Sequence, residues 1–398
     1  MAAVSGFGVG KKPKSSGGDL KQFGESVAER VDKVVKKNGF DLWGDPWTIQ
    51  GLPLIFPSSS NGFHLGLRLL LNNMKRRDPH ELEVEAQLLA SDKGRYKHSL
   101  RVDAPHTLGG KYRFTTRLSF SREISFPYFG FDNSTVIDPN LGDDHSYYSN
   151  TRSTPAIDFL LLRYIGGKFR TGPVMGFRWS RIAYPIPSLL DRDRPPGVMG
   201  GRSHYVGWAI IYDGLDFEPY PTVGSYHELF FTLNHPSVTA SEYEYYRTTY
   251  TWRKYYPLHH DLTLAHRLIL ENLNGDVPYY EMGSVGGSDS TIGLGGDRYF
   301  RGYKNNQFID KLRVLLGFEL RWNPVSFEFA NQDIMLGFVP FVDLGRVWKG
   351  LDQLEVGTIH ASTGLGARLI WNRRLVIRAD FAVSPEGTGV YLNLNHSF

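Results

Sequence analysis

The stretch "KLRVLLGFELRW", residues 311–322, alternates between two kinds of side chain. One face carries Leu312, Val314, Leu316, Phe318, Leu320 and Trp322, and the other carries Lys311, Arg313, Gly317, Glu319 and Arg321. A period of two places alternate side chains on opposite faces of a β-strand. The stretch is also longer than the five or six residues that are usual for a strand, and about nine to eleven residues cross a bilayer at a tilt.

The same period recurs along most of the chain. It is clear in "ELEVEAQLLA" (81–90), "KYRFTTRLSFS" (111–121), "DLTLAHRLIL" (261–270) and "RRLVIRADF" (373–381). Soluble β-sandwiches alternate too, but their strands are shorter and their apolar faces are internal. Charges recur in the middle of the polar faces here, and a water-filled lumen accommodates them. The pattern therefore predicts an all-β fold, a sixteen-stranded antiparallel transmembrane β-barrel.

The sixteen predicted strands are separated by alternately short and long connections. The strands are expected near 48–56, 62–73, 80–91, 94–105, 111–125, 154–165, 169–184, 202–213, 223–234, 242–256, 261–272, 310–322, 334–348, 359–371, 374–383 and 388–398. The long connections, 126–153, 185–201 and 273–309, each follow an odd-numbered strand. This parity places the long loops on the extracellular side and both ends of the barrel in the periplasm.

The composition excludes several other classes of protein. The chain has 398 residues, a mean hydropathy of −0.31 and 14% aromatic residues, and it has no apolar run of about 18 residues that would form a transmembrane helix. A net charge of +4 is too small to indicate a nucleic-acid partner. The absence of cysteine excludes disulfides and thiolate metal sites.

No motif indicates an enzyme. The chain has neither a Gly-x-Ser-x-Gly elbow nor a His-Glu-x-x-His metal site. His259, His260 and Asp261 could suggest a metal site, but they fall at a predicted periplasmic turn. We expect no catalysis, no metal and no cofactor.

The first 47 residues form a segment distinct from the barrel, which we assign to residues 48–398. Residues 1–18 are rich in Gly, Ser and Lys, and we expect them to be disordered. A single amphipathic helix follows, because one stripe carries Leu20, Phe23, Val27, Val31 and Val34. The start lacks the features of a signal peptide, so we expect a mature form whose leader was removed or replaced. The helix could plug the lumen, lie along the membrane face or act as a tether.

The run "GLGGDRYFRGYKNNQF", residues 293–308, lies in the longest predicted loop. Its glycines could form a phosphate-binding loop, but no βα pattern and no Lys-Ser/Thr pair accompany them. A mobile surface loop is also a poor fit, because Tyr299, Phe300 and Tyr303 are costly to expose together. Arg301 on a loop folded inward could instead pair with luminal acids on nearby strands, and alternation places Glu319 and Asp343 on luminal faces.

These residues carry a resemblance to a known family. The stretches "GGDRYFRGY", "GFEL" and "FVDLG" follow one another in an order that resembles the BamA/TamA family of outer-membrane assembly and translocation barrels, also called bacterial surface antigens. The resemblance covers about residues 48–398 and is strongest over 283–398. It implies that the sixth extracellular loop folds into the lumen and is locked there, with the latch residues Arg301, Gly302, Tyr303, Glu319, Asp343 and Gly345.

Two further parts of the family pattern are recognisable. "YDGLDFEPYPTVG" resembles a conserved turn, with Asp213, Asp216, Pro221 and Gly224, although Leu215 replaces the usual arginine. The first and last strands, with Leu54 and Leu392, would meet at a weak seam, and Phe398 resembles the family's C-terminal insertion signal. Family members commonly carry periplasmic POTRA domains of about 75 residues, whereas the 47 residues before this barrel are too few for one.

The resemblance implies insertion or translocation of proteins or lipids through a labile seam in the bacterial outer membrane. The expected partners are outer-membrane lipids (lipopolysaccharide and phospholipid), client proteins and periplasmic or lipoprotein partners, with a monomeric barrel. A passive or plugged pore is the alternative, because a lumen lined with charges of both signs suits it too. A structural or adhesion barrel with long loops is a third possibility.

Overall fold

A computed structural model describes residues 39–398 except 59–61, 77–79, 134, 136, 139–140, 142–145, 219, 289–290, 293–294, 297, 330–331, 356 and 358. The long strands are β2 (Asp45–Ser58), β3 (Gly62–Asn73), β4 (Leu82–Ser91), β5 (Tyr96–His106), β6 (Tyr112–Pro127), β7 (Ser149–Gly166), β8 (Phe169–Ala183), β10 (Tyr205–Asp213), β11 (Gly224–Asn234), β12 (Tyr245–His259), β13 (Leu262–Gly275), β16 (Leu312–Phe329), β17 (Gln332–Trp348), β18 (His360–Trp371), β19 (Leu375–Ser384) and β20 (Gly387–Leu394). The short strands are β1 (Phe40–Leu42), β9 (Gly200–Arg202), β14 (Ser284–Val285) and β15 (Thr291–Ile292).

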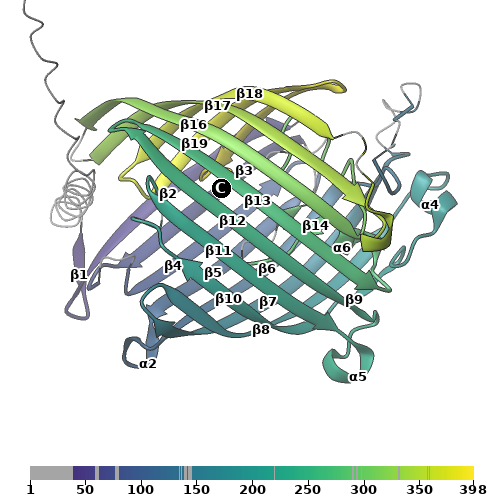
Figure 1. Ribbon diagram of the computed structural model, residues 1–398, viewed down its shortest axis with the longest axis horizontal. Coiled ribbons are helices and arrows are strands. Elements are labelled where there is room, and N and C mark those ends of the chain that lie inside the picture. Colours follow the sequence, from purple (N-terminus) through teal and green to yellow (C-terminus); the bar gives the residue numbers. More distant parts are fainter. Residues whose placement is uncertain are drawn as a thin grey trace, which may run out of the picture.

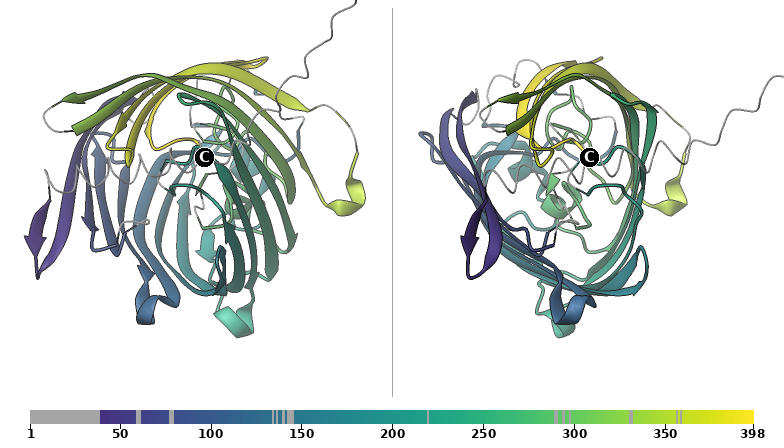
Figure 2. Two further views of the ribbon diagram at one scale, coloured as in Figure 1. Left: turned by 60° about the vertical axis from the view of Figure 1, so that its left-hand side comes forward. Right: turned by 90° about the vertical axis from the view of Figure 1, so that its left-hand side faces the viewer.

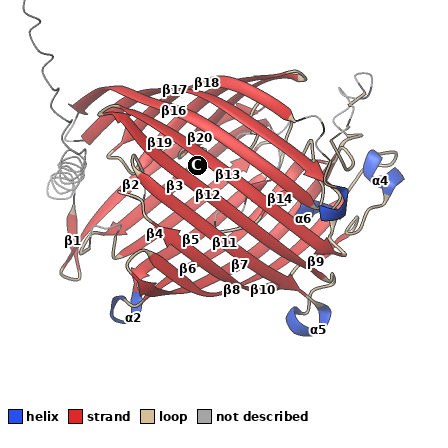
Figure 3. Cartoon of the chain, viewed as in Figure 1, coloured by secondary structure: helices blue, strands red, loops and turns tan. Residues whose placement is uncertain are grey.

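In the described part of the chain, the helical turns lie in the connections between strands (Figure 3). They are α2 (Thr107–Gly110), α4 (Leu189–Asp193), α5 (Pro236–Thr239), α6 (Tyr279–Met282) and the 3-10 turn η1 (Leu351–Gln353). No helix in the described part of the chain is long and apolar enough to cross a membrane. The predicted amphipathic helix, with Leu20, Phe23, Val27, Val31 and Val34, lies outside the described residues.

The long strands form one antiparallel meander (Figure 1). Each long strand from β2 to β20 pairs with the next long strand along the chain. The sheet curls around a central space, and the C-terminal end of the chain lies inside the curl (Figure 2). The all-β, antiparallel prediction is therefore confirmed.

Burial across the sheet is the reverse of that in a soluble protein. On β16, Arg313, Glu319 and Arg321 are buried, whereas Phe318 and Trp322 are exposed. Among the largest fully buried side chains in the described residues are four arginines, Arg301, Arg313, Arg321 and Arg378. The two-residue period predicts this arrangement, because it places every charge of a strand on the face opposite its apolar residues.

The structure corrects two predicted strands. The strand expected at 202–213 is divided, because β9 ends at Arg202 and pairs with β8 alone, whereas β10 begins at Tyr205. The strand expected at 388–398 is wrong at its end, because β20 stops at Leu394 and Asn395 adopts a φ of 64°. A left-handed residue turns the backbone out of the extended conformation, and the last residues therefore leave the sheet.

The two ends of the meander are not joined by hydrogen bonds. β2 pairs with β3 from Trp47 to Ser58 and with the short β1 at Asp45–Trp47, and β20 pairs with β19, but within the described residues no ladder joins β2 to β20. The lengths also differ, since β2 has 14 residues and β20 has 8. Beyond the residues that pair with β1, β2 therefore presents one edge of unpaired N–H and C=O groups, and β20 does the same.

Hydrogen exchange should locate this unpaired edge. In detergent or nanodiscs, amides of β2 and β20 that face away from β3 and β19 should exchange roughly tenfold or more faster than amides of the fully paired strands β12 and β13, because unpaired edges open at little cost. Exchange measured by mass spectrometry or NMR provides the comparison. Equal protection in β2, β20 and the β12–β13 pair would contradict an open edge.

Candidate functional site

The connection between β13 and β16 is the longest in the described chain, and it folds into the central space. Its residue Arg301 has no solvent-exposed surface. Tyr299, Phe300, Tyr303 and Phe308 of the same loop are also buried, and they pack on Leu315 and Val347 of the wall. The sequence argument against exposing these aromatic residues agrees with this location.

Arg301 is held by three carboxylates from three strands. Its Nε and Nη2 donate to the two oxygens of Asp343, at 2.8 and 3.0 Å, and its main-chain N–H donates to Asp343 Oδ2 at 3.1 Å. Its Nη1 donates to Glu319 Oε1 at 3.0 Å and to Asp380 Oδ2 at 3.1 Å. The guanidinium carbon lies 3.4 Å from the centre of the Phe341 ring. This bidentate, stacked arrangement suits arginine and would not be reproduced by lysine.

The residues that follow Arg301 attach the loop to the last strands. Gly302 N–H donates to the Tyr391 hydroxyl on β20 at 2.9 Å, and Ser384 Oγ donates to the Gly302 carbonyl at 2.9 Å. Gly302 has a φ of 93°, and a Cβ there would lie 3.2 Å from the Val383 carbonyl carbon, so both backbone and space favour glycine. Tyr303 donates to the Ala361 carbonyl on β18 at 3.1 Å.

Gly317 and Gly345 line the neighbouring wall. A Cβ on Gly317 would lie 3.3 Å from Phe398 and 3.4 Å from Asp343 Oδ1, so a side chain there would crowd the Arg301 site. Gly345 lies on β17, opposite Leu315 and His360 and two residues from Asp343.

Residues 395–398 share the Arg301 site. Arg267 and Arg321 donate to the main-chain oxygens of Ser397 and Phe398, at 2.8 and 2.5 Å. Ser397 Oγ donates to Glu319 Oε1 at 2.9 Å, the same oxygen that accepts from Arg301. We call these four residues the luminal tail. Phe398 is therefore buried on the inner side of the sheet and does not continue β20.

A second group of charges attaches the other end of the loop, with the opposite polarity. Here the loop supplies the acid, Glu281 of α6, and the wall supplies arginines. Arg247 Nη2 donates to the Glu281 carbonyl at 2.7 Å and to its Oε2 at 3.2 Å, while Arg152 and Arg178 lie within 3.9 and 4.0 Å. Burial alone would raise the pKa of the Glu281 carboxyl, but these arginines lower it below its ordinary value.

The loop therefore spans the central space between two parts of the wall. Arg301 and the residues after it contact β16 to β20, whereas Glu281 contacts β7, β8 and β12. We call Arg301 with its carboxylates the latch, and Glu281 with its arginines the second anchor.

The predicted turn at Asp213–Gly224 is held by its acids. Asp216 accepts from Thr222 N–H at 3.0 Å, from the Thr222 hydroxyl at 2.6 Å and from Val223 N–H at 3.2 Å. Asp213 accepts from Arg170 at 2.8 Å. Pro221 lies within the turn, and Gly224 begins β11 with a φ of 117°.

The side chain that stands where the family has arginine makes an apolar contact instead. Leu215 packs against the cluster of Tyr255, Ala265 and Phe398. The turn also ties to the wall through Glu218, whose carboxyl accepts two hydrogen bonds from Arg113, each 2.8 Å long. This contact joins the turn to β6, which is distant in sequence.

The predicted seam residues lie on opposite faces of the sheet ends. On β20, Leu392 is exposed at 59% and Val390 at 80%. On β2, Ile49 and Ile55 are exposed at 57%, whereas Leu54 points to the less exposed face. Outward-facing pairs across the seam therefore involve Ile55 rather than Leu54.

Part of the chain matches a known protein family, and solved structures share its fold. Residues 204–398, which run from just before β10 through the latch loop to β20 and the tail, match the Omp85 superfamily domain. This finding confirms the resemblance that the Arg-Gly-Tyr stretch and its two acids indicated.

Solved structures extend the likeness over most of the sheet. BamA from Haemophilus ducreyi lacking POTRA domains 1–3 superposes with a TM-score of 0.53 at 16% sequence identity, over 88% of this chain and 69% of that one. CdiB from Escherichia coli superposes with a TM-score of 0.53 at 13% identity, over 89% of this chain and 63% of that one. This chain thus spans less than two thirds of that CdiB. No curated protein sequence matches the chain.

Several residues of the latch and the second anchor could not be predicted from the sequence. Asp380 lies on the polar face of "RRLVIRADF", but nothing local marks it as a third partner of Arg301. Phe341 and Tyr391 are ordinary strand aromatics in sequence, and Glu281 lies in an irregular loop. Their roles depend on strands that meet only when the sheet curls.

Replacing Arg301 tests the latch. Arg301→Ala should leave Asp343, Glu319 and Asp380 buried without their shared cation and should destabilise the folded protein by about 3–5 kcal/mol, as expected when one partner of a buried ion pair is removed. Arg301→Lys should recover only part of the lost folding stability, because lysine cannot form the bidentate pair. Limited proteolysis of the loop and the temperature of the heat-modifiable gel shift measure the effect.

A matched control is available on the surface. Arg202→Ala removes the same charge from an exposed pair with Glu242, whose N–O distance is 3.0 Å, and should cost only about 0–1 kcal/mol. The latch would be ruled out if the Arg301→Ala protein had the same gel-shift temperature and the same rate of loop proteolysis as the Arg202→Ala protein.

The turn should lose stability in acid through Glu218. Burial would raise the pKa of the Glu218 carboxyl, but Arg113 and Arg170 outweigh burial and lower its pKa to about 2 from 4.5. A depressed carboxylate pKa stabilises the folded turn above pH 4.5, and this stabilisation is lost as the pH falls toward 2. Glu218→Gln should therefore flatten the pH dependence of turn proteolysis by an acid-stable protease between about pH 4.5 and 2. An unchanged pH profile would argue against the Glu218 contact.

Proposed function

We propose that this protein is an outer-membrane barrel that inserts or translocates proteins, or moves lipids, through the seam between β2 and β20. The Omp85 superfamily domain and the likeness to BamA and CdiB barrels support insertion or translocation of proteins as the broad function. The observation that carries the seam mechanism is the absence, within the described residues, of a ladder between β2 and β20. No catalytic role, metal or cofactor is part of this function.

The outer surface supports a location within a membrane. Large apolar side chains are exposed along many strands, including Leu229 and Phe231 on β11, Phe338 on β17 and Phe381 on β19. Monomeric soluble proteins rarely expose such continuous apolar surface. Charged side chains are buried on the opposite face, as in a barrel with a polar interior. Bacterial outer-membrane phospholipid and lipopolysaccharide would then surround the sheet.

The seam supports strand exchange with a client. Unpaired N–H and C=O groups are costly inside a bilayer, since no water is available to satisfy them. A client β-strand can satisfy them by adding to the edge of β2 or β20. The short β20 leaves part of the β2 edge without an opposite partner even if the two strands approach each other. The client would be a protein that forms β-strands in the membrane.

The latch supports control of this seam from within. Gly302 and Ser384 join the loop to β19, and Tyr391 joins it to β20, which is the last strand. Glu319 accepts from both Arg301 and Ser397, so the loop and the luminal tail share one carboxylate. Movement of β20 toward β2 would disturb both the contacts of the loop and the contacts of the luminal tail. We therefore propose that the locked loop fixes the inner position of β20.

The proposal keeps three features as expectations. The barrel would work as a monomer with periplasmic or lipoprotein partners. The residues that precede β1 would form a separate segment, with the predicted helix as plug, interfacial element or tether, whereas β1 and the first residues of β2, which were predicted to belong to this segment, lie in the sheet. The sixteen long strands would close into a barrel when β2 and β20 come together.

Cross-linking the seam tests the mechanism. The chain has no cysteine, so Ile55→Cys and Val390→Cys introduce an outward-facing pair without background reaction. A bis-maleimide linker between them should abolish protease-protected insertion of an unfolded β-barrel client into proteoliposomes. A cysteine pair with a disulfide-based linker should regain activity after reduction.

The matched control places the same linker within a complete ladder. Leu67 and Leu88 are opposite residues of β3 and β4, and both are exposed. Leu67→Cys with Leu88→Cys should leave insertion unchanged. Full activity of the linked seam variant would exclude the seam mechanism, and a large steady conductance in planar bilayers without client insertion would favour the alternative, a passive pore.

A further inference from the structure

The turn between β12 and β13 holds two histidines and an aspartate outside the latch. Strand β12 ends at His259 and β13 begins at Leu262, so His260 and Asp261 form the turn. The ladder shifts register between Pro257 and His259, at a β-bulge or a similar irregularity. Bulges change the direction in which the following side chain points, and they recur beside functional sites. The turn lies at the same end of the sheet as the start of β2.

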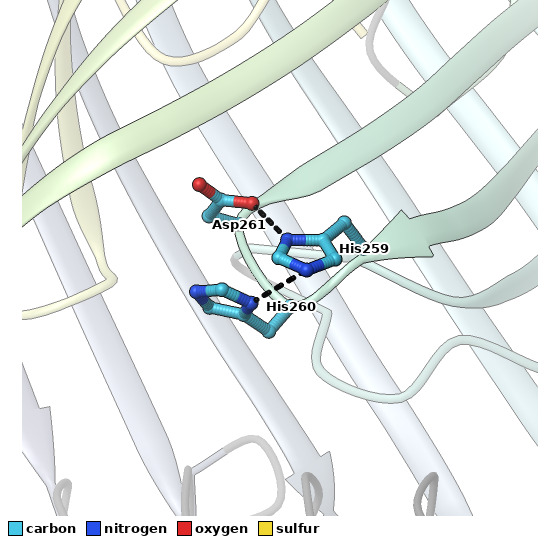
Figure 4. A group of neighbouring side chains, drawn as sticks. All are labelled: His259, His260 and Asp261. Carbon is cyan, nitrogen blue, oxygen red and sulfur yellow. Dashed lines mark hydrogen bonds and ion pairs between the residues drawn. The ribbon is translucent and has the colours of Figure 1, made fainter.

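Two ring nitrogens of this turn point toward each other (Figure 4). His259 Nε2 and His260 Nδ1 are 3.3 Å apart. Two nitrogens bound at about 2.0–2.1 Å to a tetrahedral zinc ion lie about 3.3–3.4 Å apart, which is the edge of the tetrahedron. The spacing therefore matches two ligands of one metal ion. The His259 side chain is 62% exposed, so an ion can reach the site from solvent.

The aspartate favours one tautomer of His259. His259 Nδ1 lies 2.7 Å from Asp261 Oδ1. An ionised carboxylate can only accept, so Nδ1 carries a proton, and in the neutral ring Nε2 then keeps its lone pair. Histidines that bind metals commonly donate their second nitrogen to a carboxylate in this way.

Asp261 is itself held by the next strand. Trp322 Nε1 donates to Asp261 Oδ2 at 3.0 Å, and Asn323 N–H donates to the Asp261 carbonyl at 2.8 Å. Both donors belong to β16, so the chain from the imidazole through the carboxylate to the wall is continuous. The histidine that would bind a metal is thus oriented by a carboxylate, and a donor from the wall holds that carboxylate. These supporting contacts distinguish the turn from two exposed histidines that merely lie next to each other.

We propose that His259 Nε2 and His260 Nδ1 bind one divalent transition-metal ion, with Asp261 orienting His259. Imidazole nitrogen suits Zn²⁺, Ni²⁺ and Cu²⁺, whereas Mg²⁺ and Ca²⁺ prefer oxygen ligands. Water completes the coordination. His260 binds as the tautomer that carries its proton on Nε2, so no net proton is released from the neutral rings. The sequence alone predicted no metal at this turn, and the geometry leads to the opposite inference.

This site is independent of insertion or translocation. It lies on a turn outside the latch, the second anchor and the seam. A bound ion would connect His259, the last residue of β12, with His260 in the turn, and Asp261 connects His259 to β16. Metal binding would thereby stabilise this turn. Metal binding and client insertion can therefore be measured separately, and either proposal can fail alone.

Titration of the full chain with Zn²⁺ tests the proposal. Calorimetry on protein in nanodiscs, with any polyhistidine tag removed, should give one ion per chain. His259→Ala and His260→Ala should each weaken binding by at least about tenfold, and Asp261→Asn by roughly 10–100-fold, the usual effect of losing an orienting partner. X-ray absorption should report imidazole nitrogens about 2.0–2.1 Å from zinc. Mg²⁺ and Ca²⁺ should not compete.

His106→Ala is the matched control, because His106 lies at the same end of the sheet, where β5 ends. It should leave zinc affinity unchanged, and a normal heat-modifiable gel shift should show that all variants fold. Failure to bind one zinc ion in the millimolar range would show that the two rings form only a hydrogen bond. Binding that survives both His259→Ala and His260→Ala would place the ion elsewhere. Either result would overturn the proposal.

Discussion

The bidentate pair between Arg301 and Asp343 is the contact on which the interior of this sheet depends. A guanidinium without solvent exposure is tolerated only where carboxylates and hydrogen bonds compensate for its lost hydration. Three strands supply those carboxylates, and the aromatic residues beside Arg301 fill the space around them. The loop is therefore held against the inner face of the sheet. Through the Arg301 side chain it also couples the relative positions of β16, β17 and β19.

Glu319 extends this coupling to the luminal tail. Because it accepts from Arg301, Arg321 and Ser397, it joins the loop, the wall and the last residues of the chain. The short β20 follows from the same arrangement, since residues that lie inside the sheet cannot also continue the strand. The early end of β20 and the inward tail are thus two consequences of one turn at Asn395. On the opposite wall, Glu281 and its arginines fix the other end of the loop with reversed charges.

Much of this architecture follows from periodicity. The alternation in "KLRVLLGFELRW" predicts that Glu319 and Arg321 are luminal, and both are buried. The parity of short and long connections places the long loops at one end of the sheet, and the family resemblance implies which of them enters the lumen. The order of Arg301, Glu319 and Asp343 in sequence suggests their pairing, and the structure brings the three residues together. Prediction fails where the backbone leaves its regular conformation, as at Asn395, because alternation carries no information about a single left-handed residue.

The two-residue period of the sequence determines which face each strand residue takes, because it admits only two directions. The sequence also indicates that an arginine within an aromatic loop needs acids nearby, and it points to Glu319 and Asp343. The third acid follows from the tertiary structure. Asp380 lies 79 positions from Arg301 along the chain, and it reaches Arg301 because register and curl bring β19 beside the loop. The same holds for Asp261, which Trp322 of β16 holds beside His259, and for the two histidine nitrogens, which lie 3.3 Å apart at the turn.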